Sequence, residues 1–418
     1  MTGEPADGAP SPAAALAPSP ATHLAAAPAF DELVGQEPVI AQLSAAAAGA
    51  ASASSAQRSL AMTHAWLFTG PPGSGRSVAA RAFAAALLCA DQGCGQCPSC
   101  LQVAAGSHAD LLLVRPDGLS YGVRQTRDLV LRAAAAPVSG RWRVVLFEDA
   151  DRATEQAANA LLKAIEEPSP RTVWLLCAPS AEELVTTIRS RCRLVTLRTP
   201  PAEAVAEVLT RRDGVDPAKA LAAARAAQGH VGRAKRLATD PDAAQRRAEV
   251  LRVPTRVVSL GTALTAAAGL VKAAEQEAAA ITEELNEPEK TALRRAFGEG
   301  STGKGVAKAV RGGAGALSDL EARQKSRATR LKRDALDRAL LDLAAFYRDV
   351  LVLQFGADAD LDLSSAGYED ELRQLAAGSS PEATVRRIEA IMTCRERLEL
   401  NVAPLLAVEE MTLTLFAS

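Results

Sequence analysis

The stretch GPPGSGRS, residues 70–77, decides the fold of this chain. A phosphate-binding loop has the pattern G-x-x-x-x-G-K-[ST], in which glycines let backbone amides approach phosphate, the lysine reaches the β- and γ-phosphates, and the hydroxyl holds magnesium. A short buried strand is expected before the loop, at Ala65–Phe68, and a helix opens at its end. Strand, glycine loop and helix are the context that such a site requires. The candidate phosphate and magnesium contacts are Gly70, Gly73, Gly75, Arg76 and Ser77.

One position of the loop departs from the pattern, because Arg76 replaces the lysine. A guanidinium group is planar, larger than an ammonium and binds as a fork, whereas lysine acts as a point charge. Two interpretations therefore stay open at this point. Either the loop binds phosphate through arginine, or it retains a tight turn and holds no nucleotide.

Apolar runs after the loop predict the rest of an α/β domain. Buried strands are expected at Val144–Phe147 and Val173–Cys177, with a helical segment, EQAANALLKAIEEP, between them. Strands that alternate with helices indicate a parallel sheet with crossover helices. After Pro200 the strand signals stop, so residues 200–248 are expected to form a small helical domain and residues 249–418 a second one built of long helices. The predicted fold class is α/β plus all-α.

Composition agrees with a helical protein and limits its partners. The 418 residues are 48% hydrophobic but only 3% aromatic, and alanine is abundant, which favours helix packing. The net charge of −2 excludes a global field that would draw the chain onto nucleic acid. No apolar run is long enough to span a bilayer and no signal peptide is evident, so a cytosolic protein is expected. Residues 1–29 are expected to be a disordered Ala/Pro-rich leader, and the glycine-rich residues 298–316 a flexible insertion.

An acidic pair ends the second predicted strand, where a nucleotide site needs one carboxylate for magnesium and one to activate water. Glu148 and Asp149 stand there, in the reverse of the usual Asp-Glu order. Asp149 is one methylene shorter than the usual base, and a displacement of about 1 Å can cost on the order of a hundredfold in rate. The alternative is that both acids simply cap the strand.

Four cysteines lie in CADQGCGQCPSC, with the spacing C-x₄-C-x₂-C-x₂-C: Cys89, Cys94, Cys97 and Cys100. Four thiolates this close predict a tetrahedral structural zinc site. With all four positions filled by protein, no position is left for a catalytic water. A disulfide framework is the alternative, and a reducing compartment argues against it.

Alternating arginines follow in TTIRSRCRLV, where Arg189, Arg191 and Arg193 lead into another strand. On spacing alone, a solvated helix face is an alternative to a functional role for these arginines.

Together these motifs resemble the clamp-loader branch of the AAA+ proteins over residues 30–240. The motifs that carry the resemblance are VGQ at 34–36, the phosphate loop, the four-cysteine module, EDADR, NALLKAIEEP and SRC at 190–192. Within this branch, the altered loop, the reversed acidic pair and GSHAD at 106–110 are most similar to the delta-prime subunits of bacterial DNA polymerase III. Alanine richness and the long third part resemble actinobacterial members.

The resemblance implies an AAA+ nucleotide-binding fold with a zinc-binding insertion, a helical lid and a C-terminal helical collar. It implies a hetero-pentamer with delta and gamma/tau subunits that places a sliding clamp on primed DNA, using ATP bound between subunits. Arg191 would project as an arginine finger into a neighbour's ATP site and be worth about 10³ to 10⁵ in rate. Val34 and Arg233 would join the nucleotide-binding residues, and the chain itself would hydrolyse little or no ATP.

Two sensor positions depart from the family's pattern. Ala178 replaces a polar residue at the end of the strand that follows the acidic pair. The second sensor is usually Gly-x-x-Arg, whereas Arg233 stands one residue late, and a turn of about 100° per helical residue would move it away from the γ-phosphate.

Two other functions agree less well with these residues. An active clamp-loader ATPase of the gamma/tau type, or a related remodelling ATPase, is disfavoured by Arg76, the reversed acidic pair and Ala178. A zinc-dependent DNA-binding protein is disfavoured by the near-neutral charge, and nothing resembles a polymerase site. The basic run RQKSRATRLKR, residues 323–333, is either a contact to DNA phosphates or a solvated helix face.

Overall fold

The computed structural model describes residues 27–52, 62–116, 118–296, 306–356, 364–365 and 367–417. Most of the expected leader, residues 1–26, lies outside this part of the chain. Residues 28 and 29 belong to a short 3₁₀ helix, η1 (Pro28–Phe30), and Phe30 is buried in the core that follows. The described fold therefore begins two residues before the predicted end of the leader.

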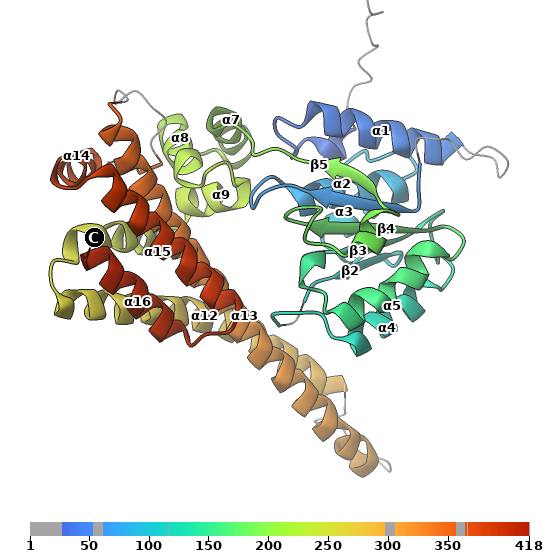
Figure 1. Ribbon diagram of the computed structural model, residues 1–418. Helices are drawn as coiled ribbons and strands as arrows, with labels where there is room; N and C mark the ends of the chain where they lie inside the picture. The colour runs from blue at the N-terminus through green and yellow to red at the C-terminus, as the bar shows by residue number, and fades with distance from the viewer. Residues whose placement is uncertain are drawn as a thin grey trace, which may run out of the picture.

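Five parallel strands form the predicted sheet in the order β2-β3-β4-β1-β5 (Figure 1). The expected strands are β1 (Ala65–Thr69), β3 (Arg143–Phe147) and β4 (Thr172–Ala178), and the strand after the arginines is β5 (Arg193–Thr196). One edge strand, β2 (Leu111–Val114), was not predicted. The predicted parallel α/β sheet is thereby confirmed.

Helices cover both faces of this sheet because side chains alternate along each strand. Trp66 and Phe68 of β1 pack on one face with α1 (Glu37–Ser52), α2 (Arg76–Leu88) and α3 (Pro98–Ala104). Leu67 packs on the other face with α4 (Val123–Ala133) and α5 (Glu155–Glu166). Two short elements, η2 (Ala150–Arg152) and α6 (Thr186–Arg189), follow strand ends. The carboxyl ends of the strands meet at one edge, where parallel α/β sheets place their ligands.

Three helices after the sheet share a small core of their own: α7 (Ala202–Asp213), α8 (Pro217–Ala226) and α9 (Val231–Thr239). We call them the lid. The next helix, α10 (Pro241–Leu251), buries Val250 in the following core, so the cores divide near Asp240. This division lies a few residues before the predicted end of the lid at residue 248.

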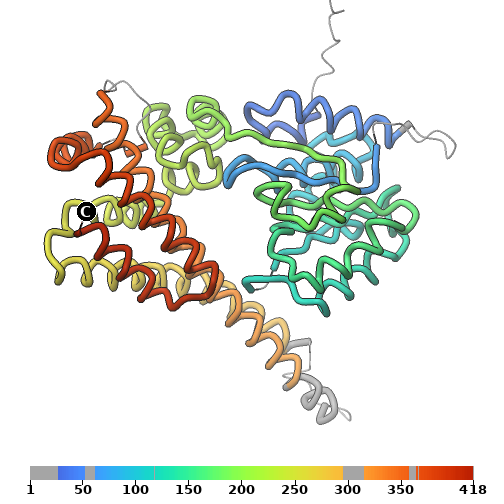
Figure 2. Tube along the Cα trace, in the orientation of Figure 1, coloured from blue at the N-terminus to red at the C-terminus, as the bar shows by residue number. Residues whose placement is uncertain are grey.

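The remaining helices form the part that we call the collar: α10, α11 (Val253–Arg256), α12 (Leu260–Ala296), α13 (Val306–Gln354), α14 (Glu369–Gly378), α15 (Pro381–Glu399) and α16 (Pro404–Ala417). Helices α12 and α13 run side by side and extend past the other collar helices as a hairpin (Figures 1 and 2).

The expected flexible insertion at 298–316 is wrong for its second part. Residues 298–305 lie outside the described residues, but 306–316 are the first turns of α13. A glycine costs a helix only about 1 kcal/mol relative to alanine, and the alanines between these glycines are the strongest helix formers. In the described residues, no helix is both long and apolar enough to cross a membrane.

Candidate nucleotide site and metal centre

The phosphate loop joins β1 to α2 at the carboxyl edge of the sheet, as predicted. Gly70, Gly73 and Gly75 all have positive φ, a conformation that glycine adopts without steric cost. Gly75 is the N-cap residue of α2, which begins at Arg76. Backbone amides and a helix N-terminus therefore converge where a phosphate would lie.

Arg76 points back at its own loop. Its Nη1 donates to the carbonyl oxygen of Gly70 at 2.7 Å. The Ser74 hydroxyl is buried inside the loop and has no hydrogen-bond partner. The lid also lies close to the loop, since a Cβ on Gly73 would meet the Cβ of His230 at 2.7 Å. Arg76 and His230, the N-cap residue of α9, thus occupy part of the space over the loop.

Ser77, the expected magnesium ligand, lies in the first turn of α2 and is half-buried. Its hydroxyl lies beside the Cys177 thiol of β4, which packs on the same face of the sheet as α2. Burial raises the pKa of the Cys177 thiol well above its usual range, although a hydrogen bond with Ser77 acts in the opposite direction. The Ser77 hydroxyl therefore stands beside a neutral thiol.

Glu148, the expected magnesium carboxylate, is held by two arginines of the chain. Arg115 Nε lies 2.6 Å from Glu148 Oε2, and its Nη2 lies 3.4 Å from Oε1. Arg81 Nη2 reaches the same Oε1 at 3.5 Å. The paired carboxylate raises the pKa of Arg115, although burial acts against it. A cation would have to displace this charged fork to reach Glu148.

Asp149, the expected base, is held by the collar. Its backbone is in the left-handed region, with φ of 50°. Its Oδ2 lies 3.2 Å from Arg330 Nη2, and Arg330 Nη1 donates to the carbonyl oxygen of Pro116 at 2.7 Å. Arg330 therefore joins the middle of α13 to the edge of the sheet. On the same face, Arg152 lies 4.0 Å from Asp334.

Arg330 belongs to the basic run 323–333, for which the structure gives a third role. Four of its basic residues have partners within the chain: Arg327 with Glu289, Arg330 with Asp149, Lys332 with Glu275, and Arg333 with Asn401. Three of these four partners are acids of other elements, so this part of the run differs from the solvated helix face that was one of the two interpretations.

The two sensor positions are Ala178 on β4 and Arg233 on α9. Ala178 ends β4 beside Thr69 of β1, buried, and brings no polar group to the loop. Arg233 points at the collar, where its Nη2 lies 2.5 Å from Asp342 Oδ1 of α13. The third expected contact, Val34, precedes Gln36, whose amide bonds the backbone of Arg198. The VGQ segment is thereby fixed to the connection between sheet and lid.

Arg191 lies at the surface just after α6, with 41% of its side chain exposed. Its Nη2 lies 2.8 Å from Glu166 Oε1 at the end of α5, and its Nη1 donates to the carbonyl of Thr187 at 2.9 Å. It is remote in sequence from this chain's phosphate loop, and its guanidinium is positioned by a carboxylate of another helix. An exposed arginine held in this way is available to an adjacent molecule.

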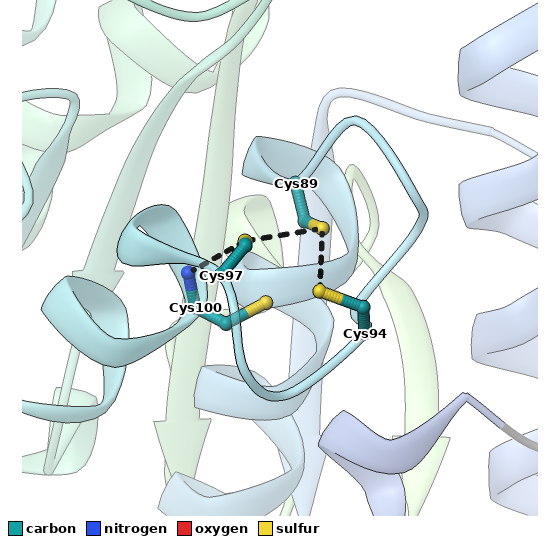
Figure 3. A group of neighbouring side chains, drawn as sticks. All are labelled: Cys89, Cys94, Cys97 and Cys100. Atoms are coloured by element: carbon teal, nitrogen blue, oxygen red, sulfur yellow. Dashed lines mark hydrogen bonds between the residues drawn. The ribbon is translucent and has the colours of Figure 1, made fainter.

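The four cysteines form the predicted cluster between α2 and α3 (Figure 3). All four sulfurs lie within 4.8 Å of one another. Cys89 Sγ is 3.7 Å from that of Cys94 and 3.6 Å from that of Cys97. Sulfurs bound to one tetrahedral zinc ion lie about 3.8 Å apart, so the donor set fits a metal, and the cysteines are free rather than paired in disulfides.

Backbone groups favour the thiolate form of Cys89, whereas burial raises the pKa of Cys100 above its usual range. Burial raises the pKa of Cys89. Hydrogen bonds from the backbone of Cys94, Gly93 and Asp91 and from the Cys97 side chain outweigh this effect and lower the pKa to about 7. The backbone N–H of Cys100 also points at Cys97 Sγ, at 3.4 Å. Thiolate is the form that binds metal. The four residues can therefore hold one metal ion with no further ligand.

The GSHAD segment attaches this metal module to the sheet. His108 Nε2 lies 2.9 Å from Ser99 Oγ of α3, and Ser99 Oγ donates to the carbonyl of Leu88. Asp110 is fully buried and accepts four hydrogen bonds from Val138, Ser139 and Gly140. These two side chains fix the start of β2, and with it the arginine that follows the strand.

Sequence reasoning missed Arg115, Glu166, His230 and the link made by Arg330. Arg115 had a signal, because it follows the apolar run Leu111–Val114 as Glu148 follows β3. Strands β2 and β3 pair with Val114 opposite Phe147, so the next residues of both strands meet. The contact of Arg330 had no signal, since it joins residues 181 positions apart.

Comparison with known proteins gives related sequences for the sheet domain. Residues 50–201 match the family model described as DNA polymerase III, delta subunit. The DNA polymerase III subunit delta′ of Pseudomonas aeruginosa is 41% identical over 164 residues, which are 38% of this chain and 50% of that protein. The delta′ subunit of Bacillus subtilis is 32% identical over 195 residues, 46% of this chain and 59% of that protein.

A second subunit type is also similar. The DNA polymerase III subunit gamma/tau of Mycobacterium bovis is 38% identical over 188 residues, 44% of this chain and 31% of that protein. The chain spans about half the length of the delta′ relatives that it matches, and less of the gamma/tau relative.

Proposed function

We propose that this chain is a delta-prime subunit of the DNA polymerase III clamp loader, which stimulates a neighbour's ATPase and hydrolyses little or no ATP itself. The proposal is supported by the family match of residues 50–201 and by the similarity to delta′ subunits. In this role it helps to place the sliding clamp on primed DNA during chromosomal replication. Its partners are delta and gamma/tau subunits in a hetero-pentamer, in the cytoplasm.

The main support for a site that does not hydrolyse ATP is the pairing of both acidic residues with arginines of the same chain. Glu148 is engaged by Arg115 and Arg81, and Asp149 by Arg330. Phosphoryl transfer depends on magnesium held by such carboxylates, on a placed water and on a cation at the phosphates. Here the carboxylates are neutralised, and Arg76 is bonded to its own loop. Whether ATP or ADP still binds is a separate matter from turnover.

Arg191 is the residue that acts in trans under this proposal. It is exposed, and it is held by Glu166 and the Thr187 carbonyl rather than by its own phosphate loop. A guanidinium placed against the γ-phosphate of the neighbour's ATP stabilises the charge of the transferring phosphoryl group. The chain would thus retain the surface of an ATPase while arginines of the same chain occupy the acidic groups of its own site.

We further propose that the metal is zinc and that its role is structural. Thiolate sulfur suits zinc, and Cys89, Cys94, Cys97 and Cys100 fill all four positions of a tetrahedral ion. When bound, the ion would fix the loop between α2 and α3. The module sits beside η1, since Ala29 N donates to the Gly93 carbonyl.

The proposal is tested by ATP hydrolysis in a reconstituted loader stimulated by clamp and primed DNA. Arg191→Ala in this chain is expected to lower the rate by at least a hundredfold at the one site that it serves. Arg189→Ala is the matched control, since Arg189 is 40% exposed on the same turn and reaches Glu182 at 4.0 Å. A loader in which both variants behave alike would contradict the trans role.

The similarity to gamma/tau subunits supports a second candidate, an active motor subunit of the same loader. The two candidates differ in what the isolated chain does. A motor binds close to one ATP per chain with magnesium and turns it over, whereas the proposed silent subunit does not turn it over. Measured turnover that is lost in Glu148→Gln would favour the motor.

A further inference from the structure

A charged cavity of about 290 Å³ lies between the lid and the collar. Its walls come from α9 of the lid and from α10, α12 and α13 of the collar. It does not include the phosphate loop or the cysteine cluster. Its volume is near the lower limit for small-molecule sites.

Five arginines line this cavity: Arg233, Arg236, Arg246, Arg247 and Arg338. Only two acidic residues, Glu277 and Asp342, line it with them, and Asp240 lies at its rim against Arg236 and Arg246, 3.5 Å from each. His230 adds no charge at neutral pH, because burial and the nearby Arg233 lower its pKa. The positive groups therefore exceed the negative ones by two.

The carboxylates organise the arginines into two clusters. Asp342, 6% exposed, is shared by Arg233 at 2.5 Å and Arg247 at 3.1 Å. Glu277, 13% exposed, is shared by Arg236 and Arg338 at 2.9 Å each and by Arg246 at 3.8 Å. The Asp342 cluster thus holds two arginines for one carboxylate, and the Glu277 cluster, with Asp240 counted, holds three arginines for two.

Hydrogen-bond capacity shows the same excess. Five guanidinium groups present about 25 N–H donors, whereas three carboxylates offer about twelve acceptor positions. One more donor is used by the carbonyl of Ser364, which Arg247 reaches at 2.8 Å. The remaining donors need water or an anion, and a partly enclosed site strengthens their interaction with an anion.

We propose that this cavity binds a small phosphate anion, inorganic phosphate or pyrophosphate, bridging the lid and the collar. Guanidinium groups bind the oxygens of phosphate bidentately, and forks from α9, α10 and α13 face one space. A bound anion would balance the excess charge and join helices of two separate cores. The small volume favours a free phosphate over a whole nucleotide. This inference does not depend on the proposed function.

The test is calorimetric titration of the full chain with sodium pyrophosphate and, separately, inorganic phosphate, at constant ionic strength held with sodium chloride. Saturable binding of one anion per chain is expected, with a rise in Tm of the collar transition. A heat that does not saturate, or that sodium chloride reproduces, would overturn the proposal.

Two variants locate the binding. Arg246→Ala combined with Arg338→Ala removes two arginines whose side chains are each 36% exposed, so the fold should tolerate the change, which circular dichroism checks. Affinity is expected to fall at least tenfold. Arg76→Ala removes the cation of the phosphate loop and should leave the affinity unchanged, as should Arg373→Ala, whose side chain is 56% exposed on α14.

Loss of binding in Arg76→Ala alone would assign the anion to the phosphate loop and refute the cavity. Undiminished binding in the double variant would refute it as well. ADP is expected not to displace pyrophosphate from Arg76→Ala, and displacement would contradict the assignment to a free phosphate.

Discussion

Asp110→Asn tests how the GSHAD segment holds the metal module and β2. The Asp110 carboxylate accepts from the backbone of Val138 at 2.6 Å and of Ser139 and Gly140 at 2.8 Å, and from the Ser139 hydroxyl at 2.8 Å. Arg143 lies 3.5 Å away. Burial raises the pKa of Asp110, but these donors outweigh it and lower the pKa to about 2.

This shift sets the expected loss of stability. An unfolded aspartate has a pKa of about 3.9, and a fall to about 2 corresponds to roughly 2–3 kcal/mol of folding free energy at neutral pH. An asparagine keeps the size but loses the charge and half of the acceptor capacity. We expect Asp110→Asn to lower the free energy of unfolding of the sheet domain by about 2–3 kcal/mol, which lowers Tm by about 5–10 °C.

Intrinsic fluorescence isolates this domain, because all three tryptophans, Trp66, Trp142 and Trp174, lie in it. The folded pKa lies below the unfolded one, so the carboxylate contributes stability above about pH 4, and this is lost as the pH falls through about 2. The difference in free energy of unfolding between wild type and variant should be about half as large at pH 3 as at pH 7. Asp128→Asn, exposed on α4, is the control. Equal stability at pH 7, or a gap unchanged from pH 6 to pH 3, would refute the reasoning.

Three further outcomes follow from named contacts. Cys94→Ser should reduce bound zinc, measured by metal analysis, from about one per chain to near zero. A strong chelator should remove the zinc from the wild type as well. Arg330→Ala should release α13 from the sheet and lengthen a spin-label distance between sheet and collar, whereas exposed Lys325→Ala should not; an unchanged distance would show that the link is dispensable. Glu166→Ala should lower loader ATPase at most about fivefold, since its pair with Arg191 is exposed and worth about 0.2–1 kcal/mol; a loss as large as that of Arg191→Ala would contradict a positioning role.

Local signals in the sequence were sufficient for most of the sheet domain. The loop with its flanking strand and helix, the second and third buried runs, and the cysteine spacing each depend on residues close in the chain. Strand β2 was missed because only four apolar residues, Leu111–Val114, mark it. A run that short does not by itself distinguish a strand from a buried turn of helix.

The contacts that the collar makes with the sheet and the lid could not be predicted in the same way. Arg330 reaches Asp149 only because the collar folds back on the sheet, and Arg233 reaches Asp342 because the lid packs on the collar. The helical step past the usual sensor position did indicate that Arg233 would turn away. Its new partner depends on tertiary packing and has no local pattern.

The central claim is that this chain acts on a neighbour's ATP and not on its own. The most direct test compares the clamp- and DNA-stimulated ATPase of loaders that carry either Arg191→Ala or Asp149→Asn in this chain alone. We predict a large loss for Arg191→Ala and a change of less than twofold for Asp149→Asn. A large loss for Asp149→Asn, with Arg191→Ala nearly neutral, would contradict the account and make this subunit a motor.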